Sequence, residues 1–524
     1  MMKQSGIRTK IALSGIALTV AGSYSQALLG MTVGAYAVAN HSSCGAGNIP
    51  GTIAELNKFF ASPDLPADFQ KNFYWTDQQV KQTDWTKDGD YQSSTSTGTG
   101  FDGSDASLLT YIASHGVTSG GVYKALSGSR NNGGCYIPTS SLELGNNVSR
   151  YTILSTCQGL KIGTGDNPAA SGENPTRTWK NAAKGLNCIL GYSNNMADAD
   201  QYGEYLLKNI KEPGNTLAKA FMDASEAVSE NNIPAVLCFG STEQDAASYI
   251  AGNSSFDTQS RPNDASSWVY RMVKQNAGEK SPSSSIPAAL KLRPVAVRAN
   301  KIAELFLGKA VNVSSADKLT TYSSDSGAAT YNKTTGVLSI TNNLVADALD
   351  QDVPSSAEAE EIARHALKVS GLGKIAGKLS LSATAEDVLG GLQGIKKVTA
   401  RKFIFKQDLA GSFGLSQQGS VEVTIGAAGT VTSIKSALVS IDSSFRSARR
   451  PTEFAARMDD IESAVIEQVA AKAPGFNYRV IKQRIGYDAG NFHKANQIAP
   501  AVIEMTVEAS QGEFARNFIE KVTL

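Results

Sequence analysis

The sequence has few of the features that place a protein in a functional class at sight. Neither a CxxC nor an HExxH spacing occurs in it, so no zinc-binding motif is indicated. Its 49 Lys and Arg residues balance 48 Asp and Glu residues, and the net charge of +1 gives no support for a nucleic-acid or membrane-surface partner. Beyond the N-terminus, no segment has the roughly 18 apolar residues of a membrane span. We therefore expect no metal, no cofactor and no nucleic-acid partner.

The first 27 residues have the pattern of a secretory signal peptide. A basic start is followed by small and apolar residues over 11–20, and Ser25 and Ala27 supply the small side chains that cleavage requires. The alternative is a membrane anchor, because apolar residues continue as far as Ala39. We favour the signal peptide, and we expect the protein after its removal to be secreted or extracytoplasmic, without a stable membrane span.

Cysteine is scarce, and its count is odd. A secreted protein with five cysteines is expected to keep at least one thiol free, and we assign that thiol to Cys157. Cys44 and Cys135 lie in Gly-, Ser- and Asn-rich loops and could pair. Cys188 and Cys238 lie inside strand-like runs, where they could pair across a sheet or be buried as small hydrophobic residues.

The chain of 524 residues is too long for one core, so we expect two or three domains. Over 28–275, short and nearly continuous apolar runs alternate with helical patterns, which indicates an α/β domain with a parallel sheet covered on both faces. The expected strands are 33–39, 108–114, 151–155, 187–192 and 235–240, and the expected helices are 53–60, 202–210 and 216–228.

The pattern changes after a stretch rich in Ser, Pro, Gly and Asn. Residues 276–290 have the composition of a linker. Over 291–524, helical segments alternate with groups of strand-like runs, which indicates an α+β region with antiparallel sheet. This pattern of helices and strands resembles the propeptide-type, cystatin-like modules of secreted peptidases. A division near 371–395 would make two such modules. We expect this region to regulate or position the first domain.

Two of the expected strands end in reactive side chains. One ends at Ser114 and is followed by His115 and Gly116; the next ends at Ser155 and is followed, after Thr156, by Cys157. In open α/β sheets, chemistry gathers beyond the carboxyl ends of the strands. A thiolate needs a nearby His to stabilise it, and glycine lets the backbone turn so that its N–H faces an oxyanion. The pair predicts a Cys157/His115 catalytic dyad, with Gly116 contributing to the oxyanion site.

The same residues carry a family resemblance. His115-Gly116 and Cys157-Gln158-Gly159 resemble the catalytic His-Gly and Cys-x-Gly motifs of the caspase-like (clan CD) cysteine peptidases, which include metacaspases, legumains, separases and gingipains. The order of His before Cys is that of the family.

The resemblance extends over the block 33–240, which is similar to an uncharacterised group of secreted caspase-like proteins. The sequence departs from the caspase signature at Ser155 and Thr156, which stand where that signature has Gln and Ala. The resemblance implies a caspase-like, doubly wound and mostly parallel sheet. It also implies hydrolysis of peptide bonds through a thioester, with His115 as the proton donor to the leaving amine.

Substrate-binding residues are expected to follow the same strand ends. Asp102 and Asp105 are excluded because they precede the strand that ends near His115, which places them at the opposite edge. The remaining candidates each follow a strand end, and His41 among them is also an alternative proton shuttle. They are Asn40, His41, Tyr192, Ser193 and Glu243.

The sequence thus predicts a secreted cysteine endopeptidase that acts on a peptide or protein substrate. The alternative, from a different class, is a catalytically inactive, secreted binding or scaffold protein that keeps the caspase-like sheet. Ligation by the same dyad differs only in the nucleophile that resolves the thioester. Cleavage preference, activation and oligomeric state are not encoded in any motif that we find.

Overall fold

The computed structural model describes 31–86, 103–119, 121–128, 134–162, 176–212, 215–251, 266–275, 286–309, 311–342, 351–391, 394–415, 419–445, 457–488 and 497–524. The predicted signal peptide, residues 1–27, and positions 276–285 of the predicted linker lie outside these ranges. Residues Met31–Leu524 form one compact unit.

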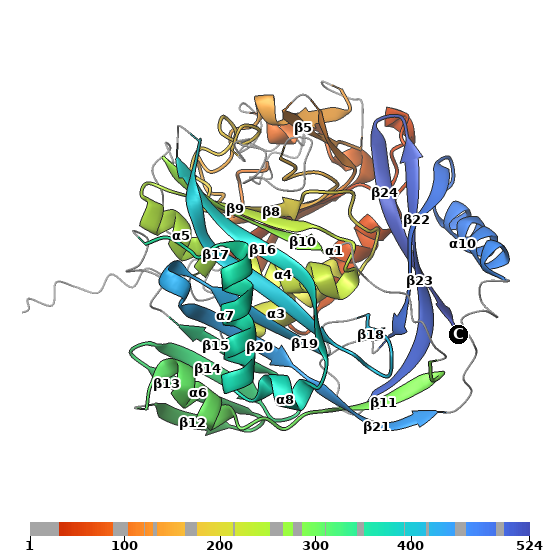
Figure 1. Ribbon diagram of the computed structural model, residues 1–524. Helices are drawn as coiled ribbons and strands as arrows, with labels where there is room; N and C mark the ends of the chain where they lie inside the picture. The colour runs from red at the N-terminus through yellow and green to blue at the C-terminus, as the bar shows by residue number, and fades with distance from the viewer. Residues whose placement is uncertain are drawn as a thin grey trace, which may run out of the picture. The chain divides into compact units, whose positions relative to one another are not determined.

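Parallel strands from the first half of the chain build one end of a large sheet (Figure 1). Their side chains are mostly apolar and almost all buried in the three central strands, which is typical of parallel strands covered on both faces. In spatial order they are β8 (Cys188–Tyr192), β7 (Tyr151–Ser155), β3 (Leu109–Ala113), β1 (Met31–Ala37) and β2 (Phe69–Thr76).

The next strand reverses direction, so the expectation of a mostly parallel sheet holds only for these five strands. β9 (Pro234–Gly240) pairs with β8 antiparallel. Two packed helices, α3 (Tyr202–Lys211) and α4 (Leu217–Val228), connect β8 to β9. A single crossover helix would return the chain to the edge where β8 begins, whereas a pair of helices returns it to the edge where β8 ends.

The sheet continues without interruption into the C-terminal half. β10 (Ser267–Gln275) pairs with β9 and with β16 (Leu379–Gly391), antiparallel on both sides. Strands on the two sides of the predicted linker therefore share one sheet inside one compact unit, which has 15 strands among the described residues. Beyond β16 follow, again antiparallel, β17 (Gly394–Gln407), β19 (Ser420–Ile425), β20 (Val431–Ala437), β15 (Leu338–Asn342), β14 (Gly327–Asn332), β13 (Leu319–Ser324) and β12 (Asn312–Ala316).

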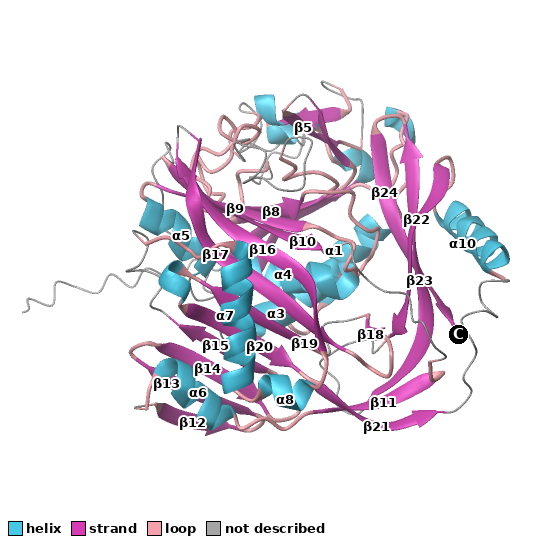
Figure 2. Cartoon of the chain, viewed as in Figure 1, coloured by secondary structure: helices cyan, strands magenta, loops and turns pink. Residues whose placement is uncertain are grey.

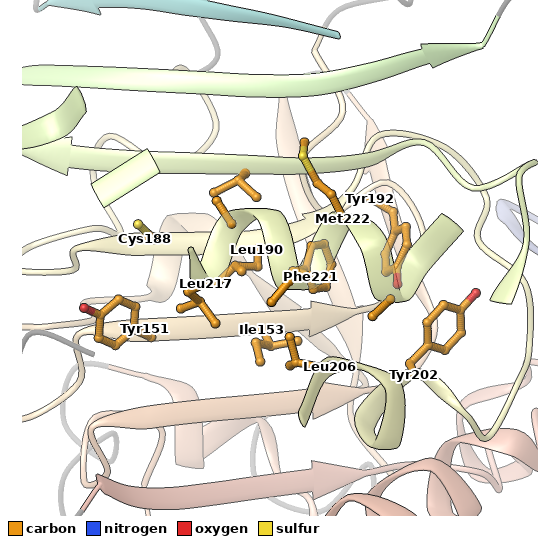
Figure 3. Close-up of a cluster of buried hydrophobic side chains, with 14 of the residues drawn as sticks. Tyr151, Ile153, Cys188, Leu190, Tyr192, Tyr202, Leu206, Leu217, Phe221 and Met222 are labelled. Carbon is orange, nitrogen blue, oxygen red and sulfur yellow. The ribbon is translucent and has the colours of Figure 1, made fainter. Parts of the chain in front are cut away.

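Helices pack on one face of the parallel strands, among the residues that the structure describes. α1 (Gly51–Ala61), α3, α4 and α5 (Glu243–Ala251) contribute to a core with the inward side chains of β1, β3, β7 and β8. Figure 3 shows Leu206 of α3 and Phe221 of α4 against Ile153 and Leu190 of the sheet. The doubly wound arrangement that we expected would need helices on the second face as well.

The second face is covered mainly by strands and irregular segments. A small sheet of β4 (Gly116–Ser119), β5 (Val122–Leu126) and β6 (Tyr136–Pro138) lies there. Trp85 and Trp179 are buried in the same core.

A separate sheet contains the C-terminal strands (Figures 1 and 2). Its order is β18 (Phe413–Gly414), β22 (Asn477–Tyr487), β23 (Gln497–Gln511), β11 (Ala289–Pro294) and β21 (Val439–Phe445), and β24 (Phe514–Thr523) also pairs with β23. The helix α10 (Met458–Lys472) packs on β22 and β23, whereas α6 (Ala299–Leu307), α7 (Ser356–Val369) and α8 (Leu372–Ala376) pack on the C-terminal strands of the large sheet. Helices packed on antiparallel strands agree with the α+β region that we expected here.

Buried ion pairs hold the C-terminal strands against the first half of the chain. Lys219 of α4 lies 3.1 Å from both Asp223 and Glu422, and Lys435 of β20 also pairs with Asp223. Removing one partner of such a buried pair leaves an uncompensated charge, which typically costs several kcal/mol. The two halves of the chain are therefore joined by buried ion pairs as well as by hydrogen bonds between paired strands.

Two disulfides link Cys44 to Cys135 and Cys188 to Cys238. The first ties the loop after β1 to the small sheet, and the second joins register partners on β8 and β9. Of the two alternatives for Cys188 and Cys238, a disulfide or two buried free thiols, the structure thus shows the disulfide. None of the described helices combines the length and the apolar character needed to cross a bilayer.

Candidate functional site

His115 and Cys157 leave two neighbouring parallel strands at equivalent positions. Ala113 of β3 and Ser155 of β7 are register partners, and each candidate lies two residues further along its strand direction. The Ser114 backbone N–H donates to the Ser155 carbonyl at 3.3 Å, so the two chains are still adjacent beyond the strands. The topology therefore brings the expected pair to one edge of the sheet.

Cys157 is the one described cysteine with a free thiol, and it is fully buried. Burial raises the pKa of the thiol, although the charge of Arg516 and a hydrogen bond from the backbone of Met196 act in the opposite direction. In this conformation the sulfur is therefore a neutral thiol, closed off from water.

His115 is also fully buried, and a carbonyl fixes its tautomer. Its Nε2 lies 2.9 Å from the Gly47 carbonyl oxygen, and since a carbonyl only accepts, Nε2 carries the proton. Nδ1 then has a free lone pair, and it has no hydrogen-bond partner. Burial, with the charge of Arg516 adding to it, lowers the pKa of His115 to about 3. The imidazole is thus neutral, and it is not hydrogen-bonded to the Cys157 thiol.

His41 lies beside His115, with 4.7 Å between the ring centroids. Its Nε2 is 3.1 Å from the Val38 carbonyl oxygen, and its Nδ1 is likewise buried without a partner. Burial, together with His115 and Arg516, lowers the pKa of His41 well below its usual value. His41 is therefore a neighbour of the candidate dyad.

Backbone geometry around Cys157 has two special features. A Cβ on Gly116 would lie 2.5 Å from the Cys157 carbonyl oxygen, so this close approach requires glycine. Gln158 has a φ of 58°, an unfavourable region for a residue with a side chain. Its amide N–H donates to the Asn194 carbonyl at 3.0 Å, and its carbonyl accepts from the Thr118 hydroxyl at 2.6 Å. Strained residues held by several contacts cluster at functional sites.

The remaining predicted substrate-binding residues do not gather around the dyad. Asn40 is exposed, and its side chain accepts from the Ser42 hydroxyl. Tyr192 lies inside the core (Figure 3). Its hydroxyl forms a 3.0 Å hydrogen bond with the Ser225 hydroxyl. Ser193 is almost fully buried, and its side chain hydrogen-bonds Tyr270.

The position expected for Glu243 is corrected by the topology. Because β9 runs antiparallel to β8, the residues that follow β9 lie at the opposite edge of the sheet from Cys157. Glu243 begins α5 there and pairs with Lys396. Asp105 was expected at the far edge and lies there, where its carboxylate accepts from the backbone N–H groups of Gly145 and Ser149 ahead of β7. Asp102 lies outside the described residues.

Three ionisable residues that the sequence did not single out lie beside the candidate dyad, at the edge where β3 and β7 end. Arg516 of β24 is fully buried, and its Nη1 donates to the carbonyl oxygens of Ser114 at 3.3 Å and Ser155 at 3.5 Å. Its Nη2 lies 3.5 Å from Oδ1 of Asp198, which follows β8. The local signal that could have drawn attention to Asp198 is its place shortly after a strand that ends at the reactive edge.

Glu55 of α1 is the third of these ionisable residues. It is fully buried, hydrogen-bonds the Tyr111 hydroxyl, and accepts from the Ser155 hydroxyl at 2.9 Å. Burial raises the pKa of Glu55 to about 8, although the Tyr111 hydrogen bond and the charge of Arg516 oppose that shift. A buried carboxyl with a strongly shifted pKa is a common feature of functional sites.

The C-terminal segment covers the edge. Phe514 and Phe476 pack on the His115 ring, with centroid distances of 5.6 Å and 5.9 Å. Asn517 forms a parallel β-bridge with Ala197. The candidate dyad is thus enclosed by residues that lie more than 300 positions later in the sequence. Within the described ranges, no three His, Cys, Asp or Glu side chains come together as metal ligands.

One comparison with known proteins matches the part of the chain that carries the candidate dyad. A family model described as a domain of unknown function (DUF6345) matches residues 36–271. No curated protein matches the chain. An uncharacterized protein from Eubacterium rectale ATCC 33656, of known crystal structure, has 9% sequence identity and a TM-score of 0.30, with 46% of this chain and 86% of that chain covered. The family match includes His41, His115 and Cys157, and it ends before Arg516.

Proposed function

We propose that this protein is a secreted cysteine endopeptidase in which Cys157 is the nucleophile and His115 is the acid/base group. The region 28–275 would be its caspase-like domain, and the C-terminal region its intramolecular regulator. One observation carries the proposal: Ala113 and Ser155 are register partners of adjacent parallel strands, and His115 and Cys157 each follow two residues later. The free thiol and the strained backbone at Gln158 are consistent with it.

The proposed chemistry is acyl transfer through a thioester. The Cys157 thiol gives its proton to the imidazole of His115, and the sulfur attacks the peptide carbonyl carbon. The C–N bond breaks as His115 passes the proton to the leaving amine. Water, deprotonated by His115, then attacks the thioester; the acid product leaves and the thiol is restored. Gly116 and Cys157 backbone N–H groups would stabilise the oxyanion in both steps.

The enclosed conformation is a resting form in this proposal. Burial raises the pKa of the Cys157 thiol, and it lowers the pKa of His115 to about 3. Transfer of the proton from sulfur to imidazole would create two buried charges, which a dry site opposes. Activity therefore requires that the C-terminal segment leaves the edge and admits substrate and water. Two disulfides suit an oxidising, extracytoplasmic location.

The test is peptide hydrolysis by the full chain and matched variants. Fluorogenic peptides with Asp, Asn, Arg or Lys before the cleaved bond are offered to the wild type, Cys157→Ala and His115→Ala. His365→Ala is the control, because His365 is exposed on α7. We expect hydrolysis that disappears in the first two variants and survives in the control. Hydrolysis that persists in Cys157→Ala contradicts the proposal.

A truncated chain would not give a clean test. β16 pairs with β10 over nine positions, and Ala383, Ala385 and Leu389 of β16 belong to the core of the parallel strands. Removal of the C-terminal region would expose that core and an unpaired strand edge.

The alternative function is a binding or scaffold protein without turnover. The observation that favours it is the complete burial of Cys157 under Arg516 and the C-terminal strands. Iodoacetamide labelling at mildly acidic pH separates the two functions. A thiol activated by His115 loses labelling in His115→Ala, whereas a structural thiol is labelled equally in both proteins.

A further inference from the structure

We propose that the edge formed by Ser114, Ser155 and Asp198 is a binding site for a guanidinium group, which the protein's own Arg516 fills in this structure. Peptides that carry arginine would compete with Arg516 for this site. The part of the inference that concerns substrates rests on the proposed peptidase function, whereas the binding site itself does not.

The groups that face Arg516 are mainly hydrogen-bond acceptors. Two carbonyl oxygens and the Asp198 carboxylate accept from its guanidinium, and the Cys157 thiol also hydrogen-bonds its side chain. Carbonyl and carboxylate oxygens only accept, so the site is complementary to a cation with several N–H donors. The planar fork of a guanidinium suits this arrangement better than the compact ammonium of lysine.

Arg516 is held loosely by its oxygen partners. Its contacts with Ser114, Ser155 and Asp198 measure 3.3–3.5 Å, its side chain also hydrogen-bonds the Cys157 thiol, and its Nε is buried without a partner. Arg271, an arginine in the structural interior, instead binds Asp387 through two hydrogen bonds of 2.5 Å and 2.7 Å. Charge-assisted bonds are short when their geometry is good. Arg516 therefore has the contacts of an occupant that another guanidinium can replace.

The backbone that carries Arg516 binds this edge as an added strand would. The Asn517 N–H donates to the Met196 carbonyl at 3.0 Å, and the Asp198 N–H donates to the Asn517 carbonyl at 2.6 Å. This single bridge joins β24 to the loop after β8. Extended peptides bind proteins in this way, with backbone hydrogen bonds for affinity and a side-chain pocket for specificity. The segment 514–517 thus occupies the edge as a peptide ligand would.

Arg516 also contributes to the enclosed state of the candidate dyad. Its charge contributes, after burial itself, to the lowered pKa of His115 and His41. Together with Phe514, which packs on His115, it excludes water from the thiol. Departure of β24 from this edge would remove the cation and the cover at once.

The test asks whether a small guanidinium compound fills the space that Arg516→Ala leaves. Arg516→Ala is mixed with N-ethylguanidinium, with the neutral isostere N-ethylurea, or with ethylammonium, and the thermal midpoint and the iodoacetamide labelling rate of Cys157 are measured. Without additive we expect labelling about tenfold or more faster than in the wild type, because less local opening is required. N-ethylguanidinium should raise the midpoint and slow the labelling, and the other two should do neither.

Two further variants control the result. Arg479→Ala removes an exposed arginine of β22 that pairs with Glu508, and it should behave as the wild type does. Asp198→Asn combined with Arg516→Ala should weaken the effect of N-ethylguanidinium. Equal effects of N-ethylguanidinium and N-ethylurea, or no effect on the folded Arg516→Ala protein, overturn the inference.

Arg516→Lys keeps the test decisive if Arg516→Ala does not fold. It retains the charge but not the fork, so Cys157 should be labelled faster than in the wild type; an unchanged rate overturns the inference. The peptide screen on the opened variant then separates the two proposals. N-ethylguanidinium binding without any Cys157-dependent hydrolysis rejects the peptidase and keeps the site, whereas hydrolysis without preference for arginine peptides rejects the inference about substrates.

Discussion

The guanidinium of Arg516 donates to the backbone carbonyl of Ser114 at 3.3 Å, although 402 positions of sequence separate the two residues. Ser114 directly precedes His115, so a side chain from the last strand lies at the start of the candidate catalytic segment. β24 therefore helps to enclose the candidate dyad in this structure.

The burial of Cys157 predicts a cryptic thiol. The native wild type should react with a thiol reagent far more slowly than the unfolded chain, because the sulfur is reached only through local opening. After unfolding without reductant, one thiol per chain should titrate, since the other four cysteines are in disulfides. A larger titre would show that a disulfide is absent.

Glu55 predicts a pH-dependent stability. Its pKa is raised to about 8 in the folded protein, so between about pH 4.5 and 8 the folded state holds a proton that the unfolded state has lost. Stability should therefore fall as pH rises through this window, by on the order of a few kcal/mol. Urea unfolding of the wild type and Glu55→Gln across that range measures the free energy of unfolding at each pH. The slope of that free energy against pH should flatten in the variant. Glu361→Gln, at an exposed position of α7, should keep the wild-type slope.

The disulfide between β8 and β9 predicts a large loss of stability when it is removed. It closes a loop over a sequence separation of 50 residues, for which the chain-entropy argument gives about 4 kcal/mol. The double variant Cys188→Ala/Cys238→Ala should therefore unfold at clearly lower denaturant concentration. An unchanged unfolding midpoint would contradict a bridge in the native protein.

Gly116 and Gly373 predict opposite responses to alanine. A Cβ at Gly116 would lie 2.5 Å from the Cys157 carbonyl oxygen, whereas a Cβ at Gly373 in α8 has ordinary contacts of 3.4 Å or more. Gly116→Ala should destabilise the fold and speed Cys157 labelling, because the Cys157 backbone must move. Gly373→Ala should stabilise by about 0.5–1 kcal/mol, since alanine favours helix. Thermal unfolding of both variants and the wild type measures these opposite changes in stability.

Local elements were predictable where the pattern was strongly apolar. The strand expected at 151–155 is β7 without change, and the one expected at 108–114 is β3 shortened by one residue at each end. Buried parallel strands are short, apolar and flanked by turn residues, and all of this is visible in the sequence. The shared edge of His115 and Cys157 followed from the same pattern, because both strands run in one direction.

Direction and long-range pairing were not predictable in the same way. The strand at 235–240 was recognised, but its antiparallel pairing with β8 depends on how α3 and α4 pack, and that moved Glu243 to the other edge. Tyr192 at a strand end lies in the core because its side chain points to the helix-covered face. Neither property has a local signature.

By itself, the sequence determined the cysteine count, the apolar strands, and the positions of His115 and Cys157 after them, because local side-chain chemistry sets these features. Only the tertiary structure decided that one sheet joins both halves of the chain and that Arg516 and Asp198 meet beside the thiol. Such contacts depend on the packing of segments hundreds of positions apart, and no residue type near the dyad encodes them.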